Sequence, residues 1–371
     1  MSYALRTWLI LGGLLFTVMG CTRPPTTPAS TATVGAPTHA IALNFLVDTT
    51  GEVKLKRQGW SDYTPVTFGT PLEWGDLVQV SDTATAAIAC ADLSVETLRP
   101  GYLGGLPCAQ TQPVLIRAEA PVLTPRSGAL PLYPAILSPR ATFLLDPYPR
   151  LKWSPVTTQV VTYTVTVRGY ALNWQAYTQQ TELVYPTDAP ALQPGGDGYV
   201  LVVEANGHSS EEEGNVFRGF TLLGADQVAQ IQHYAQQIAA LNLSDAGRRY
   251  VTAQMYASQG LRAAATTDLE ALVQSTPSPA AWNALANQYL AVGLYGNAAA
   301  AYETAQQSAV THGDALAQAY ALWGLGQAYH SLNAVTAARG YAQQALAAFQ
   351  SLNDAAGIRL SETLLAELGN P

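Results

Sequence analysis

The sequence predicts a multidomain protein in which two small all-β modules precede an all-α region of stacked helix pairs. Short runs of alternating apolar and polar residues dominate two segments, 41–112 and 148–222, and this period of two is typical of half-buried strands. After Ala225 the apolar residues follow helical spacing instead, as in ADQVAQIQHYAQQIAAL, and Ser244 is expected to be the N-cap of the helix that follows. In residues 223–371 a pattern of small and aromatic residues also recurs, which indicates a repeat architecture.

The composition fits a globular protein and argues against a nucleic-acid-binding one. The chain has 371 residues, long enough for two or three domains. Apolar residues make up 48%, enough to fill hydrophobic cores, whereas charged residues reach only 12%. The net charge is −8, and the only lysines are Lys54, Lys56 and Lys152. Because nucleic-acid binding needs clustered lysine and arginine, we expect no nucleic-acid partner.

The first twenty residues have the features of an export signal. Arg6 precedes an apolar run from Trp8 to Gly20, which is too short to span a bilayer core, since that takes about twenty residues. We interpret residues 1–20 as a cleaved signal peptide. A buried strand and an uncleaved anchor are the alternatives.

The end of this run suggests how the protein is held at a membrane. Val18, Met19, Gly20 and Cys21 resemble a bacterial lipobox, which implies that Cys21 is acylated and becomes the mature N-terminus. A chance cysteine after an ordinary signal peptide is the alternative. Two or three acyl chains would anchor a protein stably where one would not. Residues 21–40 are rich in Thr, Pro and Ala and are expected to form a disordered tether. We therefore expect an extracytoplasmic, lipid-anchored protein of the bacterial envelope.

Residues 41–112 form the first predicted β module. The runs GEVKLKRQGW and DLVQVSDTATAAIACADLSVETL alternate as strands do, and glycines separate them as turns. The segment resembles the FecR-like domain, a small β-rich module of envelope proteins. The matching positions are Gly51, Val53, Trp60, Gly69, Leu72, Gly75 and Asp76. Members of that family often act as periplasmic sensors through a cytoplasmic segment, which we do not expect to remain here after signal cleavage.

Two cysteines of this region, Cys90 and Cys108, are expected to form a disulfide. An exported chain meets oxidising conditions, in which a remaining pair usually joins. A metal site would need further ligands nearby, and the sequence supplies none. Free thiols are the alternative.

The second β module is expected after a proline-rich linker, residues 113–147, whose prolines exclude helices and central strands but leave room for edge segments. Residues 148–222 then resemble a fibronectin type III sandwich, with Trp153 on an early strand, Tyr163 in a Y-x-V-x-V run and Tyr199 at a corner. The resemblance implies that the Tyr199 hydroxyl bonds back to the chain. Trp153 and Tyr163 are expected in the core rather than at a ligand.

Residues 223–371 resemble tetratricopeptide repeats. The clearest repeat contains Trp282, Leu285, Ala286, Tyr289, Gly293, Ala298, Tyr302 and Ala305. A second occupies Leu322, Leu325, Gly326, Tyr329, Ala338 and Ala345, and a looser one precedes both. Tyr256, Tyr289 and Tyr329 lie 33 and 40 residues apart. The first spacing matches the ordinary repeat of about 34 residues, and the second implies longer helices, as in a forty-residue variant of the repeat. Because each helix pair is too small to bury its own apolar face, the pairs must stack.

Such stacks bind partners in a concave groove lined by the first helix of each pair. Carrying the groove positions of the family over to this chain gives Tyr250, Gln254, Asn283, Asn287, Trp323 and Gln327. Amides there can bond an extended peptide backbone, and aromatic rings add contact area. Cations that would clamp a terminal carboxylate are missing from these positions, so no such clamp is expected. The alternative for Trp323 is that it only packs between helices.

The sequence gives little sign of catalysis, and we expect no enzyme, no cofactor and no metal. The five histidines lack metal-ligand spacing, and no G-x-S-x-G or phosphate-loop motif is present. The acidic run Glu211–Glu213 beside His208 is expected to be a solvated turn rather than a metal site.

Three functional hypotheses remain. The first is a lipid-anchored envelope scaffold that binds a protein partner in the helical groove. The second is binding of cell-wall glycan through the β modules. The third is an extracytoplasmic sensor subunit of a signalling complex, as the FecR-like resemblance suggests.

Overall fold

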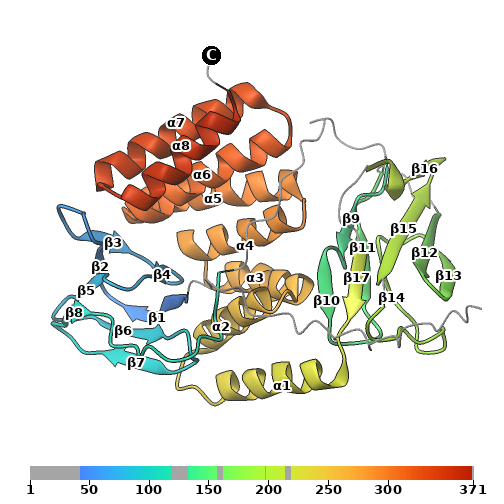
Figure 1. The fold of residues 1–371 in the computed structure, drawn as a ribbon, viewed down its shortest axis with the longest axis horizontal. Coiled ribbons are helices and arrows are strands. Elements are labelled where there is room, and N and C mark those ends of the chain that lie inside the picture. Colours follow the sequence, from blue (N-terminus) through green and yellow to red (C-terminus); the bar gives the residue numbers. More distant parts are fainter. Residues whose placement is uncertain (1–41, 118–132, 157–161, 197, 214–218, 370–371) are drawn as a thin grey trace, which may run out of the picture. The chain divides into compact units, whose positions relative to one another are not determined.

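The computed structural model describes residues 42–117, 133–156, 162–196, 198–213 and 219–369. The expected signal peptide, Cys21 and tether lie outside these residues, as does the middle of the expected proline-rich linker. In the described part, a β-rich first half is followed by eight helices (Figure 1), which confirms the predicted order of β modules and helical region.

The first β module consists of two antiparallel four-stranded sheets, in the orders β4-β1-β6-β7 and β3-β2-β5-β8. Its strands are β1 (Asn44–Thr50), β2 (Val53–Lys56), β3 (Thr64–Val66), β4 (Pro71–Leu72), β5 (Leu77–Val80), β6 (Thr85–Ala89), β7 (Val95–Leu98) and β8 (Leu103–Gly105). Leu46 of β1, Leu55 of β2, Val78 of β5 and Ile88 of β6 share one core. The two sheets therefore pack face to face.

Strand β1 buries both of its faces, which explains its nearly continuous apolar sequence. Leu46 points into the core between the two sheets. Its neighbours Phe45 and Val47 belong to a different core, together with Tyr250 and Val251 of the helical region. Because side chains alternate along a strand, β1 packs on the other sheet with one face and on the helices with its opposite face.

The second β module also has two sheets, in the orders β14-β11-β9 and β10-β17-β15-β12-β13, with β16 paired to β15. Its elements are β9 (Ile136–Ser138), β10 (Thr142–Leu144), β11 (Arg150–Trp153), β12 (Tyr163–Gly169), β13 (Leu172–Thr178), β14 (Glu182–Val184), β15 (Tyr199–Ala205), β16 (His208–Ser209), the short 3₁₀ helix η1 (Ser210–Glu213) and β17 (Gly219–Leu222). Strands β9 and β10 come from the segment expected to contain a linker and edge segments, and each lies at the edge of its sheet, with β9 paired to β11 and β10 to β17.

The core of this module contains the aromatic residues that the sequence placed there. Trp153 is 1% exposed and Tyr163 3% exposed, and their rings meet edge to face. The Tyr199 hydroxyl accepts a hydrogen bond from Gln193 N at 2.7 Å. This bond back to the preceding loop is the one expected of a corner tyrosine.

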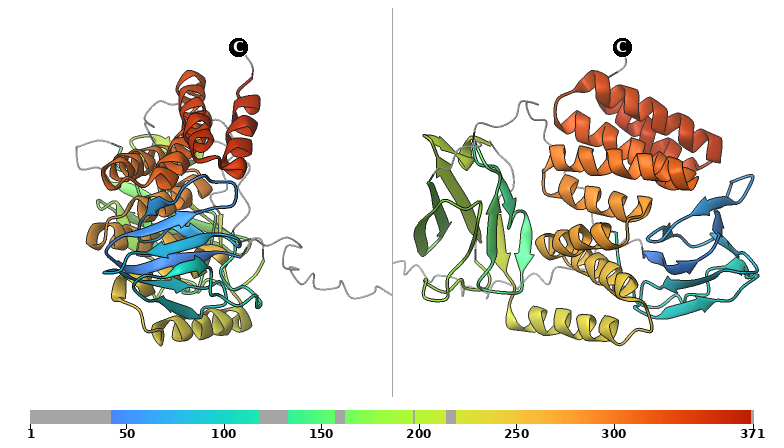
Figure 2. Two further views of the ribbon diagram at one scale, coloured as in Figure 1. Left: turned by 90° about the vertical axis from the view of Figure 1, so that its left-hand side faces the viewer. Right: turned by 180° about the vertical axis from the view of Figure 1, so that it is seen from behind.

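The helical region runs from Ala225 to Glu367. Its helices are α1 (Ala225–Ala239), α2 (Asp245–Ser258), α3 (Arg262–Ser275), α4 (Pro279–Ala291), α5 (Tyr295–His312), α6 (Ala315–Ser331), α7 (Val335–Leu352) and α8 (Ala355–Glu367). Each helix packs on the next, and α6 also contacts α4 and α8 (Figure 2). No helix in the described part of the chain is both long and apolar enough to cross a membrane.

Small residues set the close approach of these helices. Ala286, Ala298 and Ala338 are fully buried. At Gly324, an added Cβ would lie 2.3 Å from the ring of Tyr302, so only glycine fits there. The small residues singled out in the repeats therefore lie where neighbouring helices meet.

The helix starts alternate between two types. Helices α2, α4, α6 and α8 begin with side-chain N-caps, and these are Ser244, Ser278, Asp314 and Asp354. Helices α3, α5 and α7 follow Leu261, Leu294 and Ala334, which provide no such cap. Ser244, the cap expected from the sequence, accepts a hydrogen bond from Gly247 N.

Candidate binding groove

The six predicted groove residues line one cavity with a volume of about 390 Å³. Tyr250 and Gln254 come from α2, Asn283 and Asn287 from α4, and Trp323 and Gln327 from α6. Each pair is four residues apart, so its two side chains lie on the same face of their helix. The structure thus brings all six together, while their role in binding a partner stays a prediction.

Tyr250 already makes its contacts within the protein, with residues of the first β module. Its hydroxyl donates to Gly69 O at 2.7 Å, and its ring meets Phe45 and Phe68 edge to face. Complete burial raises the pKa of Tyr250 well above that of a free tyrosine. Tyr250 therefore holds the first β module rather than offering a free surface.

Asn283 is also committed to an internal contact. It is 9% exposed, and its Nδ2 donates to Ala317 O of α6 at 2.9 Å. Asn287, one turn further along α4, is exposed and accepts a hydrogen bond from the Tyr302 hydroxyl at 2.6 Å. Of the two asparagines, only Asn287 presents its amide to solvent.

Trp323 combines the two roles that the sequence left open. It is half-buried and packs against the clusters that contain Phe349 and Leu364, and it also lines the cavity. Its indole Nε1 is buried without a hydrogen-bond partner. Gln254 and Gln327 are half-buried on the same wall. The part of the predicted groove that remains accessible therefore consists of Gln254, Asn287, Trp323 and Gln327.

The opposite wall of the cavity comes from the first β module, and sequence reasoning missed it. Leu43, Phe45, Ile116, Arg117 and the loop 69–71 provide this wall. Two hydrogen bonds join the residues just before this loop to the helices. Thr67 Oγ1 donates to Asp314 Oδ2 at 2.8 Å, and Ser278 Oγ donates to Phe68 O at 2.7 Å. A contact between residues about two hundred positions apart leaves no periodic signal in a single sequence.

The first module contacts all four capped helix starts. Asp48 accepts hydrogen bonds from Ser244 N and Ser244 Oγ. Ser278 and Asp314 bond the loop after β3, as described above. Arg57 NH1 lies 3.8 Å from Asp354 Oδ2. The alternation of N-caps therefore has a structural reason, because the capped ends are those that meet the β module.

Arg57 forms the most buried charge cluster at this contact. Its Nε lies 3.0 Å from Asp76 Oδ1, and a second nitrogen donates to Asp76 Oδ2 at 3.2 Å. Burial raises the pKa of Asp76 above its usual value even though the guanidinium opposes this shift. Asp76, which the sequence matched to a family position, is therefore a structural partner of Arg57.

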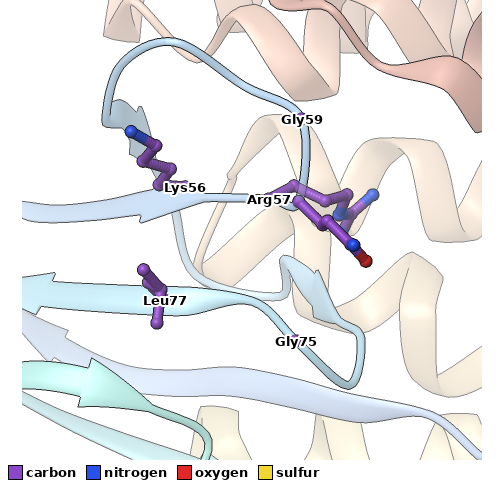
Figure 3. A pocket seen from close by; sticks show the side chains of 6 residues that line it. Lys56, Arg57, Gly59, Gly75 and Leu77 are labelled. Atoms are coloured by element: carbon purple, nitrogen blue, oxygen red, sulfur yellow. The ribbon is translucent and has the colours of Figure 1, made fainter.

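A second hollow of about 290 Å³ lies beside Arg57, along β2 and β5 (Figure 3). Lys56 and Leu77 line it together with Gly59 and Gly75. The cations here have partners, because Lys56 Nζ donates to Ser61 O at 2.8 Å and Arg57 bonds Asp76. Both cations of this hollow are therefore already hydrogen-bonded within the protein.

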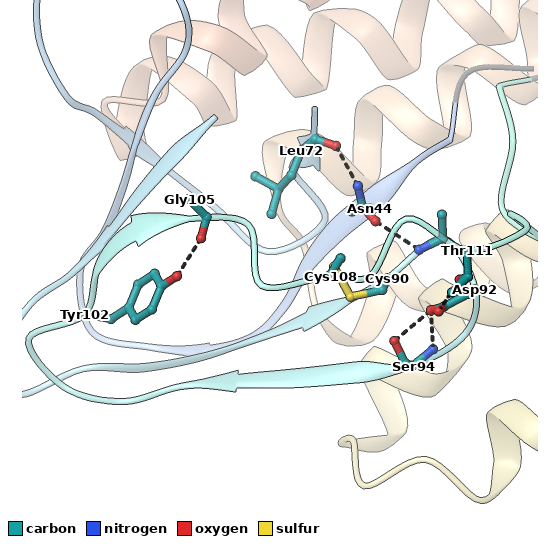
Figure 4. Close-up of a disulfide and its surroundings, with 10 residues drawn as sticks. Asn44, Leu72, Cys90, Asp92, Ser94, Tyr102, Gly105, Cys108 and Thr111 are labelled. Carbon is teal, nitrogen blue, oxygen red and sulfur yellow. Dashed lines mark hydrogen bonds between the residues drawn. A yellow bond between two sulfur atoms is a disulfide. The ribbon is translucent and has the colours of Figure 1, made fainter. Parts of the chain in front are cut away.

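Cys90 and Cys108 form the predicted disulfide, with their Cα atoms 5.6 Å apart (Figure 4). The bond joins the end of β6 in one sheet to the segment after β8 in the other. Next to it, Asn44 accepts from Ala91 N at 3.0 Å, and Asp92 accepts from Ser94 and Thr111. The disulfide closes the end of the first module that faces the chain's next segment.

The acidic run after His208 is exposed at Glu211 and Glu212, as expected of a solvated turn, but is buried at Glu213. Glu211–Glu213 belong to η1, and Glu213 is buried against Arg140, with 2.7 Å between Arg140 NH1 and Glu213 Oε2. Arg140 also donates to Val292 O after α4. Glu213 thus helps to dock the second module on the helices. Within the described residues, no group of three or more His, Cys, Asp or Glu side chains could hold a metal ion.

Comparison with known proteins gives no relative from which to transfer a function. No protein-family model matches the chain, and no curated protein matches it significantly.

Proposed function

We propose that this protein is a lipid-anchored scaffold of the bacterial envelope that binds a protein partner through the groove of its helical region. The helices are best assigned as tetratricopeptide-like repeats, the first module as FecR-like and the second as fibronectin type III-like. Three observations support these assignments: the repeat residues at the helix contacts, the Tyr199 hydroxyl bond and the paired sheets of each module.

The observation that carries the proposal is the convergence of the groove residues on one cavity. Gln254, Asn287 and Gln327 bring amides to its wall, and Trp323 brings an aromatic ring. Amides can donate to and accept from a peptide backbone, while an aromatic ring supplies apolar contact area at small entropic cost. This combination suits an extended protein segment.

Crosslinking in cells tests the proposed groove. Partners crosslinked to the wild-type chain should be lost when Asn287→Ala and Trp323→Ala are combined. They should be retained by Tyr177→Ala, which removes a 70% exposed aromatic ring from the second module instead. Retention of every partner in the double variant would contradict binding through the groove.

The anchor is tested separately. Labelling with palmitate should mark the wild-type protein and leave the Cys21→Ala variant unlabelled. Equal labelling of both would contradict acylation at Cys21, whatever the groove binds.

One observation favours a second candidate function, the binding of cell-wall glycan. Tyr170 is 97% exposed and Tyr177 70% exposed, and both lie on the β12–β13 hairpin of the second module. Exposed aromatic rings beside polar side chains can stack on sugars. If this second function holds, the wild-type protein should sediment with purified cell wall and a Tyr170→Ala plus Tyr177→Ala variant should not.

A further inference from the structure

The walls of the groove cavity carry positive charge only. Among the described residues that line it, the charged ones are Arg117 and Arg262, and no Asp or Glu lies on the wall. This is unexpected in a chain with a net charge of −8. The cavity therefore differs in sign from the protein that surrounds it and favours an anionic ligand.

Arg262 lacks a counter-charge. It is the first residue of α3 and is half-buried, and no carboxylate of the described residues lies within 4.0 Å of it. Burial lowers the pKa of the Arg262 guanidinium from its usual value, which shows that desolvation of the charge is not offset by an acidic neighbour. The start of α3 is already bonded within the protein, because Ala263 N donates to Thr142 Oγ1 at 3.1 Å, so the Arg262 side chain is the group available to a ligand.

Arg117 lies on the opposite wall, and hydrogen bonds to the backbone of the preceding residue, Ile116, hold this part of the chain in place. Ile116 N donates to Ser258 Oγ at 3.0 Å, and Ser258 Oγ in turn donates to Ile116 O at 3.0 Å. Arg117 itself is paired with Glu73 at 3.2 Å, and its side chain is 45% exposed. Arg262 is therefore the cation of this cavity that is free to pair with a ligand, because the charge of Arg117 is balanced by Glu73.

The rest of the cavity suits an apolar body. Leu290, Leu316, Leu360 and Trp323 contribute apolar surface to its walls. Its volume of about 390 Å³ falls within the range of about 300–1,000 Å³ that is usual for small-molecule sites.

We propose that this cavity binds a small organic acid, with its carboxylate on Arg262 and its apolar body against the leucines and Trp323. This site shares its walls with the groove proposed above for a protein segment, and the peptide measurement described below distinguishes the two occupants. The ligand class follows from a single unpaired cation beside an apolar space, because a carboxylate on a hydrocarbon body satisfies both.

Calorimetric titration of the full chain with three probes of equal chain length tests the proposal. Octanoate should bind saturably, while octylamine and octanol should bind at least about tenfold more weakly, since they lack the charge that pairs with a guanidinium. Arg262→Gln should weaken octanoate binding by about tenfold or more and leave octanol unaffected. Arg262→Lys should keep part of the affinity.

Arg359→Gln is the matched control, because Arg359 is an exposed arginine of α8 that does not line the cavity. It should bind octanoate as the wild type does. Absence of saturable octanoate binding, or equal binding by Arg262→Gln, would overturn the proposal. Binding of a synthetic glutamate-rich peptide, but not of octanoate, in an Arg262-dependent manner would assign the cavity to a protein segment and overturn it as well.

Discussion

Arg57 is the residue on which the charges of the first module and the helices converge. Asp76 binds it directly, and Glu73 and Asp354 each lie 3.8 Å from its NH1. Asp76 and Asp354 are almost fully buried. Such a cluster stabilises the fold only as a whole, since each buried carboxylate relies on the same guanidinium.

Replacing Arg57 by methionine should therefore lower the free energy of unfolding by about 3–5 kcal/mol, because buried carboxylates would lose their counter-charge. Arg150→Met is the control. Arg150 pairs with Glu182 at 2.7 Å, but both side chains are about half exposed, and such surface pairs contribute about 0–1 kcal/mol. Urea unfolding of both variants measures the difference, and equal losses would contradict a structural role for the Arg57 cluster.

The contribution of the Tyr329 side chain to the stability of the fold should depend on pH. Burial, together with the hydrogen bond that its hydroxyl donates to Glu303 at 3.0 Å, raises the pKa of Tyr329 to about 12. A folded-state pKa above the unfolded value of about 10 means that the protonated hydroxyl stabilises the fold below about pH 10. This contribution is lost as the pH rises through about 12.

The Tyr329→Phe variant should accordingly lose less stability than the wild type between about pH 10 and about pH 12. Denaturant unfolding at several pH values measures this. Tyr170→Phe, at a 97% exposed position, should follow the wild type. Parallel curves for wild type and Tyr329→Phe would show that the hydroxyl is not held in its protonated form by the fold.

At the scale of elements, the capped helix starts tie the helical region to the first module. Ser278 illustrates this double use of one side chain, because its Oγ accepts from Ala281 N at 3.0 Å and donates to Phe68 O at 2.7 Å. The first bond stabilises α4 alone, and the second joins α4 to the loop after β3.

Ser278→Ala should lower the free energy of unfolding by more than the loss of an ordinary N-cap does. Loss of the cap removes about 1 kcal/mol, and the buried carbonyl of Phe68 left without its donor adds about 1–3 kcal/mol. Ser275→Ala, at an exposed position near the end of α3, should change stability by less than about 0.5 kcal/mol. Thermal and urea unfolding give both values. A loss of about 1 kcal/mol or less at Ser278 would mean that its bond to Phe68 contributes nothing.

At the scale of the whole molecule, the first module and the helices share a hydrophobic core. Phe45 and Val47 of β1 pack with Tyr250, Val251 and Met255 of α2. The second module instead keeps a core of its own, built around Leu151, Trp153 and Tyr163. The stability of the helices should therefore depend more on the packing of the first module than on the core of the second module.

Phe45→Ala tests this dependence. The cavity it creates should cost about 3–5 kcal/mol and should lower the denaturant midpoint of the helical circular dichroism signal, although the substitution is in a strand. Leu151→Ala, in the separate core, should leave that helical midpoint nearly unchanged. A helical midpoint unaffected by Phe45→Ala would mean that the two parts unfold independently.

Much of this architecture was predictable from the sequence, for a local reason. Alternating runs, helical spacing and N-caps act between residues a few positions apart, so the β-then-α order and the Ser244 cap could be predicted from them. The pairing of Cys90 with Cys108 was predictable for another reason, since an exported chain meets oxidising conditions that join a remaining pair. The groove residues could also be found, because repeats place equivalent positions on equivalent faces.

The sequence by itself determined which segments are strands and helices and which helix faces line a groove. Only the tertiary structure decided that the first module closes this groove, that Tyr250 and Asn283 are buried in internal contacts, that Glu213 pairs with Arg140, and that Arg262 faces the cavity without a carboxylate. These features depend on contacts between residues tens to hundreds of positions apart. Such contacts arise from shape and charge complementarity between folded surfaces, and no local pattern encodes them.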